Sequence, residues 1–122
     1  TQAGLIAAVE SLTEAGPVPV ALDIPAKRWP AAVEATAYFV IAEGLANAAR
    51  HANAAAVAVR VHEEHGELVV GVTDDGPGPG PGDGRGTGIT GLRDRVGALG
   101  GTLALSTVAD RGARLEARIP CA

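Results

Sequence analysis

Aromatic residues, methionine and cysteine are scarce in this chain. Its 122 residues include one Trp, one Tyr, one Phe, no Met and a single cysteine, Cys121. One cysteine excludes an internal disulfide framework and a cysteine-based metal site, and it is typical of a reducing cytosol. Because the chain begins without Met, we expect it to be a fragment of a longer protein.

Long apolar runs and clusters of basic residues are lacking as well. No run approaches the roughly 20 apolar residues that span a bilayer, so we expect no direct membrane contact. The net charge is -4, from 10 Lys and Arg against 14 Asp and Glu. Nucleic-acid binding needs clustered basic residues, so the charge argues against it. The size and the hydrophobic fraction of 47% predict a single globular domain over residues 1–122.

Hydrophobic periodicity predicts three helices and five strands. A spacing of three and four residues favours helices over 1–15, 30–52 and 89–99. In the second helix the apolar stripe is Val33, Ala37, Ile41, Leu45 and Ala48, and Gly100-Gly101 is expected to cap the third. Alternation favours strands over 18–24, 57–61, 68–72, 102–107 and 113–119. The last four strands form two hairpins, the first with a turn at His65-Gly66 and the second with Leu103, Leu105, Leu115, Ala117 and Ile119 on the buried side.

The order of these elements predicts an α+β two-layer sandwich. We expect a mixed sheet of about five strands, with one face exposed to solvent and the other covered by three helices. Pro19 restricts the first strand to a sheet edge. The segment 75–86, rich in Gly and Pro, is predicted to be a mobile loop.

Polar residues gather near the end of the long predicted helix. Glu43 and Asn47 are four residues apart and therefore share one helix face, with Arg50 and His51 one turn further on. A carboxamide oxygen suits Mg²⁺, and a carboxylate beside it can order a metal-bound water. The alternative is an ordinary solvated helix face.

Asp74 stands at the end of a predicted buried strand, followed by Gly76 and Gly78. Its carboxylate can accept a hydrogen bond from an exocyclic amine such as that of adenine, and the glycines leave space for a planar base. A plain Asp-Gly turn is the other interpretation.

A third signal is the run Gly-Arg-Gly-Thr-Gly at 84–88, which leads directly into a predicted helix. Backbone N–H groups at a helix N-terminus bind anions such as phosphate. The run lacks the Lys of a P-loop, and a flexible linker has the same composition.

Taken together, the three signals resemble the motifs of the GHKL ATPases. Segment 43–51 (Glu-x-x-x-Asn-Ala-x-Arg-His) is similar to the N box, 74–78 (Asp-x-Gly-x-Gly) to the G1 box and 86–92 (Gly-Thr-Gly-Ile-x-Gly-Leu) to the G2 box. Segments 38–43 and 91–101 resemble the sensor histidine kinases typified by nitrate sensors and the desaturase thermosensor.

This resemblance implies the Bergerat fold, with ATP held under a lid formed by about 75–87. It implies that Asp74 binds the adenine amine, that Asn47 holds Mg²⁺ against the phosphates, and that Glu43 polarises the γ-phosphate or its acceptor. The remaining nucleotide-binding residues implied by the motifs are Gly76, Gly78, Arg50, His51, Gly86, Thr87, Gly88, Ile89 and Leu92.

The chain departs from the family pattern at Ala113, where a Thr usually joins the hydrogen bonds around adenine. Two outcomes stay open: the affinity for adenine is lowered, or a water or Thr73 substitutes for the Thr. No helix with a phosphoacceptor histidine precedes the N box, so the acceptor is expected in a missing segment or another chain. His62 and His65 are expected at the surface.

The resemblance implies a cytoplasmic catalytic domain of a bacterial sensor histidine kinase, whose parent is membrane-bound or soluble. Its expected partners are ATP and ADP, the dimerisation and histidine-phosphotransfer domain of the parent, and a response regulator acting through the full kinase. Two alternatives stay open: an anti-sigma-factor-type GHKL serine kinase, and a degenerate interaction module that no longer binds nucleotide. The isolated chain is expected to be a monomer.

Overall fold

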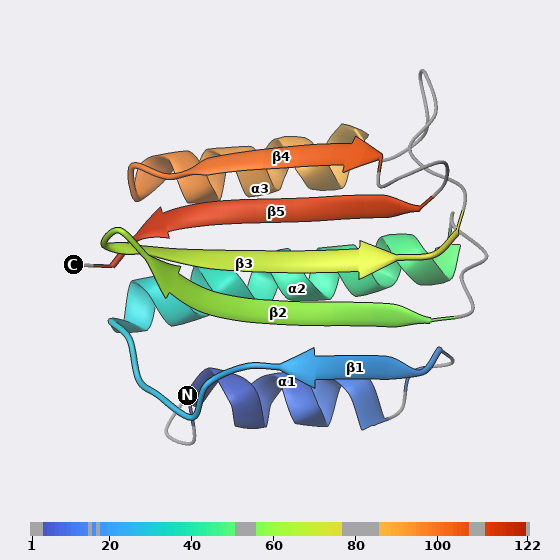
Figure 1. Ribbon diagram of the computed structural model, residues 1–122. Coiled ribbons are helices and arrows are strands. Elements are labelled where there is room, and N and C mark those ends of the chain that lie inside the picture. The colour runs from blue at the N-terminus through green and yellow to red at the C-terminus, as the bar shows by residue number, and fades with distance from the viewer. Residues whose placement is uncertain are drawn as a thin grey trace.

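The computed structural model describes residues 4–14, 16, 18–50, 56–76, 86–107 and 112–121. These residues form a layer of helices packed on a layer of strands (Figure 1). In chain order the elements are α1 (Gly4–Glu14), β1 (Val20–Asp23), α2 (Ala31–Arg50), β2 (Val57–Glu64), β3 (Glu67–Asp74), α3 (Gly86–Ala98), β4 (Thr102–Thr107) and β5 (Ala113–Pro120). Most of the predicted loop 75–86 lies outside the described residues.

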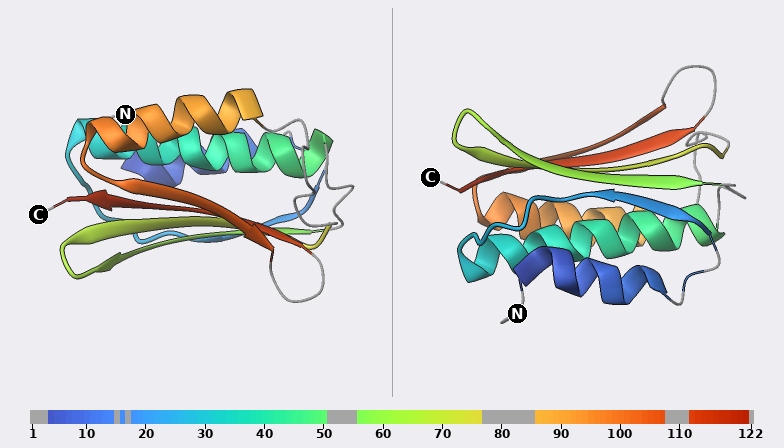
Figure 2. Two further views of the ribbon diagram at one scale, coloured as in Figure 1. Left: turned by 90° about the horizontal axis from the view of Figure 1, so that it is seen from above. Right: turned by 60° about the horizontal axis from the view of Figure 1, so that its bottom comes forward.

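The five strands form one mixed sheet in the order β1-β2-β3-β5-β4. Strand β1 runs parallel to β2, with Val20 opposite Val57, and the other neighbours are antiparallel. As Pro19 predicted, β1 is an edge strand. All three helices lie on one side of the sheet (Figure 2), which confirms the predicted two-layer sandwich.

The β2–β3 hairpin turns at His65 and Gly66, as the sequence predicted. Both residues have positive φ, 53° and 79°, which is the conformation of a two-residue type I′ turn. This turn fixes the register, with Glu64 opposite Glu67. Because the register is continuous to the far end, it brings Val57 opposite Asp74.

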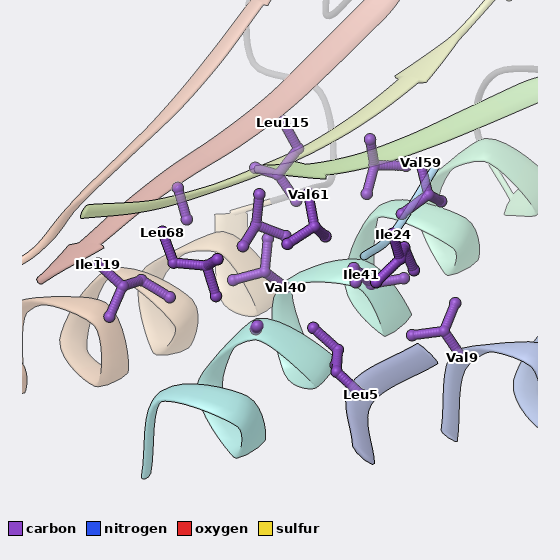
Figure 3. Close-up of a cluster of buried hydrophobic side chains, with 14 of the residues drawn as sticks. Leu5, Val9, Ile24, Val40, Ile41, Val59, Val61, Leu68, Leu115 and Ile119 are labelled. Carbon is purple, nitrogen blue, oxygen red and sulfur yellow. The ribbon is translucent and has the colours of Figure 1, made fainter. Parts of the chain in front are cut away.

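The hydrophobic core lies between the two layers, where the side chains of α1 and α2 meet those of the central strands (Figure 3). The predicted stripe on α2 is buried at Val33, Ala37, Ile41 and Ala48 and half-buried at Leu45. On β4, Leu103 and Leu105 were predicted to be buried and are half-buried. They belong to an edge strand, so only one neighbouring strand covers them.

A buried carboxylate fixes the start of α2. Glu34 is 4% exposed and accepts hydrogen bonds from Arg28 Nε at 3.0 Å and from the backbone N–H of Trp29 at 3.0 Å. The hydrogen bond from the Arg28 guanidinium is the largest cause that holds the pKa of Glu34 below its ordinary value. The buried Trp29 also donates from Nε1 to Glu63 Oε1 on β2 at 2.7 Å, so the segment before α2 is tied to the sheet.

Helix α3 begins at Gly86, three residues before the predicted start at Ile89. The first buried apolar side chain of this helix is Ile89, so apolar spacing does not detect the first turn. The N–H groups of a first turn have no intrahelical acceptor. At the other end, Gly101 N–H donates to Val96 O and Gly100, at φ 81°, donates to Gly97 O. This is a Schellman C-cap, which confirms the predicted role of the two glycines.

None of the helices in the described ranges combines the length and the apolar character needed to cross a membrane. On the helical layer, the Arg95 guanidinium of α3 lies 4.1 Å from the ring centroid of Phe39 on α2. Phe39 is 40% exposed, and this cation–π contact ties the two helices together at the surface.

Candidate nucleotide site

A polar pocket lies where the second half of α2 meets the end of β3. It has two polar side chains, Asn47 from the helix and Asp74 from the strand, in otherwise apolar walls. Its lining is Gly44, Asn47, Val72, Asp74, Leu105, Ala113 and Leu115. The pocket therefore joins one helix and three strands that are distant in the sequence.

Gly44 brings α2 close enough to β3 to form this pocket. A Cβ at position 44 would lie 2.7 Å from Cβ of Val72, closer than real atoms approach. The helix backbone therefore rests directly on the strand, and Asn47, one turn later, reaches the strand end. The sequence motifs did not predict that Gly44 belongs to the site. Gly44 is the only glycine within α2, and this was a usable signal.

Asn47 and Asp74 are only 3% and 7% exposed. Asp74 Oδ1 accepts a hydrogen bond from the backbone N–H of Gly76 at 3.0 Å, which orients the carboxylate at the strand end. Gly76 is itself buried. A buried carboxylate and carboxamide that share one pocket suit a ligand with both donor and acceptor groups.

The first turn of α3 lies beside the same face of α2. A Cβ at Gly88 would lie 2.6 Å from the carboxyl carbon of Glu43. The Glu43 carboxylate therefore occupies the space beside the Gly88 backbone, at a helix N-terminus whose dipole favours negative groups. Since Glu43 is one helical turn before Asn47, the structure brings the predicted N-box and G2-box residues together along α2.

The other predicted site residues fall into three groups. His51, Gly78 and the side chains of Arg50 and Thr87 lie outside what the structure describes. Gly86 and Thr87 contribute backbone to the first turn of α3. Ile89 and Leu92 are 5% and 6% exposed and belong to the hydrophobic core cluster.

Ala113 lies directly opposite Asp74 in the β3–β5 ladder and is 3% exposed. It therefore occupies the place beside the predicted adenine acceptor that the family pattern assigns to a Thr. The expectation that Thr73 substitutes for the missing hydroxyl is wrong. Successive strand residues face opposite sides, and Thr73 lines a trough on the open face of the sheet, where it accepts a hydrogen bond from Arg114 Nε at 3.4 Å.

The two described histidines are remote from this pocket. His65 is in the β2–β3 turn with its side chain 90% exposed, which confirms its predicted surface position. His62 is on the open face of β2, where its side chain is 33% exposed and its Nε2 lies 3.4 Å from Glu64 Oε2. Neither residue lines the pocket.

The donor groups fit a nucleotide with its metal. Within the described ranges, no group of three or more His, Cys, Asp or Glu side chains could hold a metal by itself. Asn47 offers one hard oxygen, which suits Mg²⁺ bound mainly through phosphates. The missing side chain at Gly44 keeps α2 in close contact with β3 around this space, and Gly88 leaves room for the Glu43 carboxylate beside the α3 turn.

The fold and this site define a class of protein: a two-layer sandwich that holds a polar pocket beside the N-terminus of a helix. The family of histidine kinase-, DNA gyrase B- and HSP90-like ATPases matches residues 32–122, and the chain belongs to this family. This finding confirms the resemblance to GHKL ATPases, and ATP binding is the property that the family implies. The narrower assignment to the nitrate-sensor and thermosensor group stays a prediction.

Two sensor kinases are similar in sequence. The chain is 35% identical to sensor histidine kinase YxjM of Bacillus subtilis (strain 168) over 96% of its own length, and 42% identical over 70% to the signal transduction histidine-protein kinase/phosphatase UhpB of Salmonella typhimurium. These matches cover 29% and 17% of the relatives. The chain thus corresponds to less than a third of either protein.

Solved structures share the fold. One is the histidine kinase domain of the blue-light activated histidine kinase of Erythrobacter litoralis EL346. The match covers 94% of the present chain and 57% of the chain in that structure, at 25% sequence identity and a TM-score of 0.73. Another is the ATP binding domain of PrrB from Mycobacterium tuberculosis. The match covers 100% of the present chain and 93% of the chain in that structure, at 23% sequence identity and a TM-score of 0.70. They confirm the predicted Bergerat-type sandwich.

Proposed function

We propose that this chain is the ATP-binding catalytic domain of a sensor histidine kinase. It binds Mg-ATP and donates the γ-phosphoryl group to a histidine on a separate dimerisation domain, within two-component signal transduction. The observation that supports this most strongly is the burial of Asn47 and Asp74 in one pocket, one helical turn from the contact between Glu43 and the start of α3.

In this proposal, Asp74 recognises the base. Its carboxylate is 7% exposed and is oriented by the Gly76 N–H, and it accepts the exocyclic amine of adenine. Guanine presents a carbonyl oxygen at the corresponding position, which a carboxylate repels. We therefore expect selectivity for adenine over guanine nucleotides.

The phosphates extend from this base site toward the N-terminus of α3. There, the backbone N–H groups of Gly86, Thr87 and Gly88 bind phosphate oxygens, and Asn47 holds Mg²⁺ through its carboxamide oxygen. When bound, Mg²⁺ neutralises charge on the phosphate oxygens. Glu43 polarises the γ-phosphate or its acceptor, and the domain acts mainly by positioning and charge stabilisation. Gly78, Arg50 and His51 complete the proposed phosphate and lid contacts, with Ile89 and Leu92 supporting the α3 turn.

The phosphoacceptor is proposed to lie outside the described residues. Neither His62 nor His65 lines the pocket, so the acceptor belongs to the dimerisation and histidine-phosphotransfer domain of the parent kinase. Similarity to sensor histidine kinases supports this arrangement, a cytoplasmic location for the domain, and a response regulator that acts through the full kinase.

A phosphotransfer assay tests the proposal. The chain is incubated with Mg²⁺, ATP labelled at the γ-phosphate, and the dimerisation domain of its parent as a separate polypeptide, with a His→Gln variant of the acceptor as control. Labelled phosphate that is stable to base, labile to acid and lost in the control is expected. Acid-stable phosphate would indicate a serine kinase, and absence of both nucleotide binding and transfer would indicate a degenerate interaction module.

A further inference from the structure

The helices leave one face of the sheet open (Figure 2), and a trough lies on this face. This trough has a volume of about 160 Å³ and runs along β3 between β2 and β5. Its floor is Val69, Gly71 and Thr73 of β3, and its walls are Ala58, Arg60, His62, Arg114 and Glu116. It belongs to the opposite side of the sheet from the proposed nucleotide site.

The missing side chain of Gly71 creates the hollow. Gly71 lies between Arg60 on β2 and Glu116 on β5 in the strand register. A Cβ at position 71 would meet only the backbone oxygen of Arg60, at 3.9 Å. Packing within the sheet therefore does not require glycine here, and the space above the backbone is open.

The cations of this face are not equally engaged. Toward the hairpin turn, Arg118 lies within 4.0 Å of three carboxylates, those of Glu64, Glu67 and Glu116. At the other end, within the part of the chain that the structure describes, Arg114 has only the hydroxyl of Thr73 as a partner.

Arg60 is also weakly engaged. Its Nε lies 3.7 Å from Asp23 Oδ2, with the two side chains 68% and 79% exposed. Such a solvated pair contributes little. Arg60 and Arg114 are therefore available to an incoming anion.

We propose that this trough, lined by Arg60, Gly71 and Arg114, docks an extended acidic segment of a partner protein. The volume equals about five water molecules at ~30 Å³ each, which accommodates the five heavy atoms of a Glu side chain beyond Cα. Gly71 accepts this side chain while Arg60 and Arg114 bind carboxylates.

The positions of the two cations favour a segment over a small free acid. Arg60 and Arg114 belong to neighbouring cross-strand rows, with Arg60 opposite Gly71 and Arg114 opposite Thr73. The rows are two residues apart along β3, about 6.6 Å, which is also the spacing of alternate side chains in an extended peptide. A segment with Glu at alternate positions reaches both guanidinium groups, whereas a single small carboxylate reaches one.

Glu116 does not prevent this binding. It is turned toward Arg118, whose Nε lies 4.0 Å from its Oε1. Because the whole chain carries a net charge of -4, long-range attraction does not draw an acidic peptide to it. Measured affinity would therefore report contacts in the trough.

Backbone amide chemical shifts of the ¹⁵N-labelled chain test the proposal, in a titration with the capped peptide acetyl-Glu-Thr-Glu-Thr-Glu-amide. We expect saturable shifts on β2, β3 and β5. The matched Gln-Thr-Gln-Thr-Gln peptide and free butyrate, which carries a single carboxylate, should bind at least about tenfold more weakly, the loss of one or more charge-assisted contacts. Arg114→Gln and Arg60→Gln should each weaken peptide binding about tenfold, and Gly71→Val should abolish it.

Arg93→Gln, an equal change of charge on exposed α3, should leave peptide binding unchanged. Gly71→Val should also leave binding of an ATP analogue unchanged, which separates this site from the proposed function. The proposal is overturned if millimolar peptide causes no saturable shifts, if butyrate or the Gln peptide binds as tightly, or if Gly71→Val binds like the parent chain.

Discussion

The Glu43 carboxylate on α2 lies against the backbone of Gly88 in the first turn of α3, in the space that a Cβ at position 88 would fill. This contact joins the two elements that carry the proposed catalytic carboxylate and the proposed phosphate turn. A side chain at position 88 would fill this space, so the carboxylate end of the flexible Glu43 side chain would have to move.

Gly88→Ala should reduce phosphoryl transfer by on the order of 10²-fold, because displacement of a catalytic group by about 1 Å has this effect. Transfer rates at saturating ATP measure it. Gly97→Ala is the matched control: position 97 has nothing within 4 Å, and this change should keep the rate and raise the free energy of unfolding by about 0.5–1 kcal/mol. Full activity in Gly88→Ala would show that the contact does not position Glu43.

Gly44→Ala should destabilise the protein by about 1–3 kcal/mol, the typical effect of overpacking. The added Cβ would lie 2.7–2.9 Å from the side-chain carbons of Val72. Urea denaturation of Gly44→Ala, Val72→Ala and the double variant measures the coupling. We expect the double variant to be more stable than the sum of the single changes predicts, and strict additivity would contradict the close approach of α2 to β3.

Asp74→Asn should weaken binding of an ATP analogue by about 1.5–3 kcal/mol, the value of a charge-assisted hydrogen bond. Asn47→Ala should instead abolish most of the Mg²⁺ dependence of binding. Calorimetric titrations with and without Mg²⁺ distinguish the two effects. If Asn47→Ala kept the Mg²⁺ dependence, the metal ligand would be another residue.

Ala113→Thr should tighten adenine nucleotide binding, because it places a hydroxyl opposite Asp74 in the β3–β5 ladder. One additional hydrogen bond contributes about 0.5–1.5 kcal/mol. Ala113→Val, of similar shape without the hydroxyl, is the control and should show no gain. Equal affinities for the Thr and Val variants would indicate that position 113 does not take part in base recognition.

The pKa of Glu34 is lowered first by its hydrogen bond from Arg28. A depressed pKa means that the folded state favours the carboxylate, so this stabilisation is present above the ordinary Glu pKa of about 4.3 and is lost as pH falls through the folded pKa. Glu34→Gln should therefore have a lower free energy of unfolding than the parent chain at pH 7, and this difference in free energy should decrease toward pH 3.

Urea midpoints across this pH range measure this difference, with Glu14→Gln, exposed at the end of α1, as the control. Glu63 and Glu64, whose pKa values are also lowered by their partners, titrate in both proteins and cancel in the comparison. If the difference in stability between Glu34→Gln and the parent chain stays constant from pH 7 to pH 3, the proposed role of the Arg28–Glu34 pair is contradicted.

The elements of this fold were predictable because their signals are local. Alternation located the strands, Pro19 placed β1 at an edge, and Gly100-Gly101 marked the end of α3. The strand order β1-β2-β3-β5-β4 was not predicted, since it depends on contacts between residues far apart in the chain. The first turn of α3 was missed because it carries no apolar side chain.

The site was predictable where spacing along one helix fixes it, as for Glu43 and Asn47. Tertiary contacts decided the rest. The contribution of Gly44 depends on how closely α2 approaches Val72, and the error on Thr73 came from neglecting that adjacent strand residues face opposite sides. The open-face trough at Gly71 emerges only when three strands are placed side by side.

The most direct test of the central claim is calorimetric titration of the chain with a non-hydrolysable ATP analogue, with and without Mg²⁺, and with the corresponding GTP analogue. The account predicts binding that is selective for adenine, strengthened by Mg²⁺ and weakened in Asp74→Asn. Absence of binding at millimolar nucleotide, or equal binding of the two analogues, would contradict a nucleotide site built on Asp74 and Asn47.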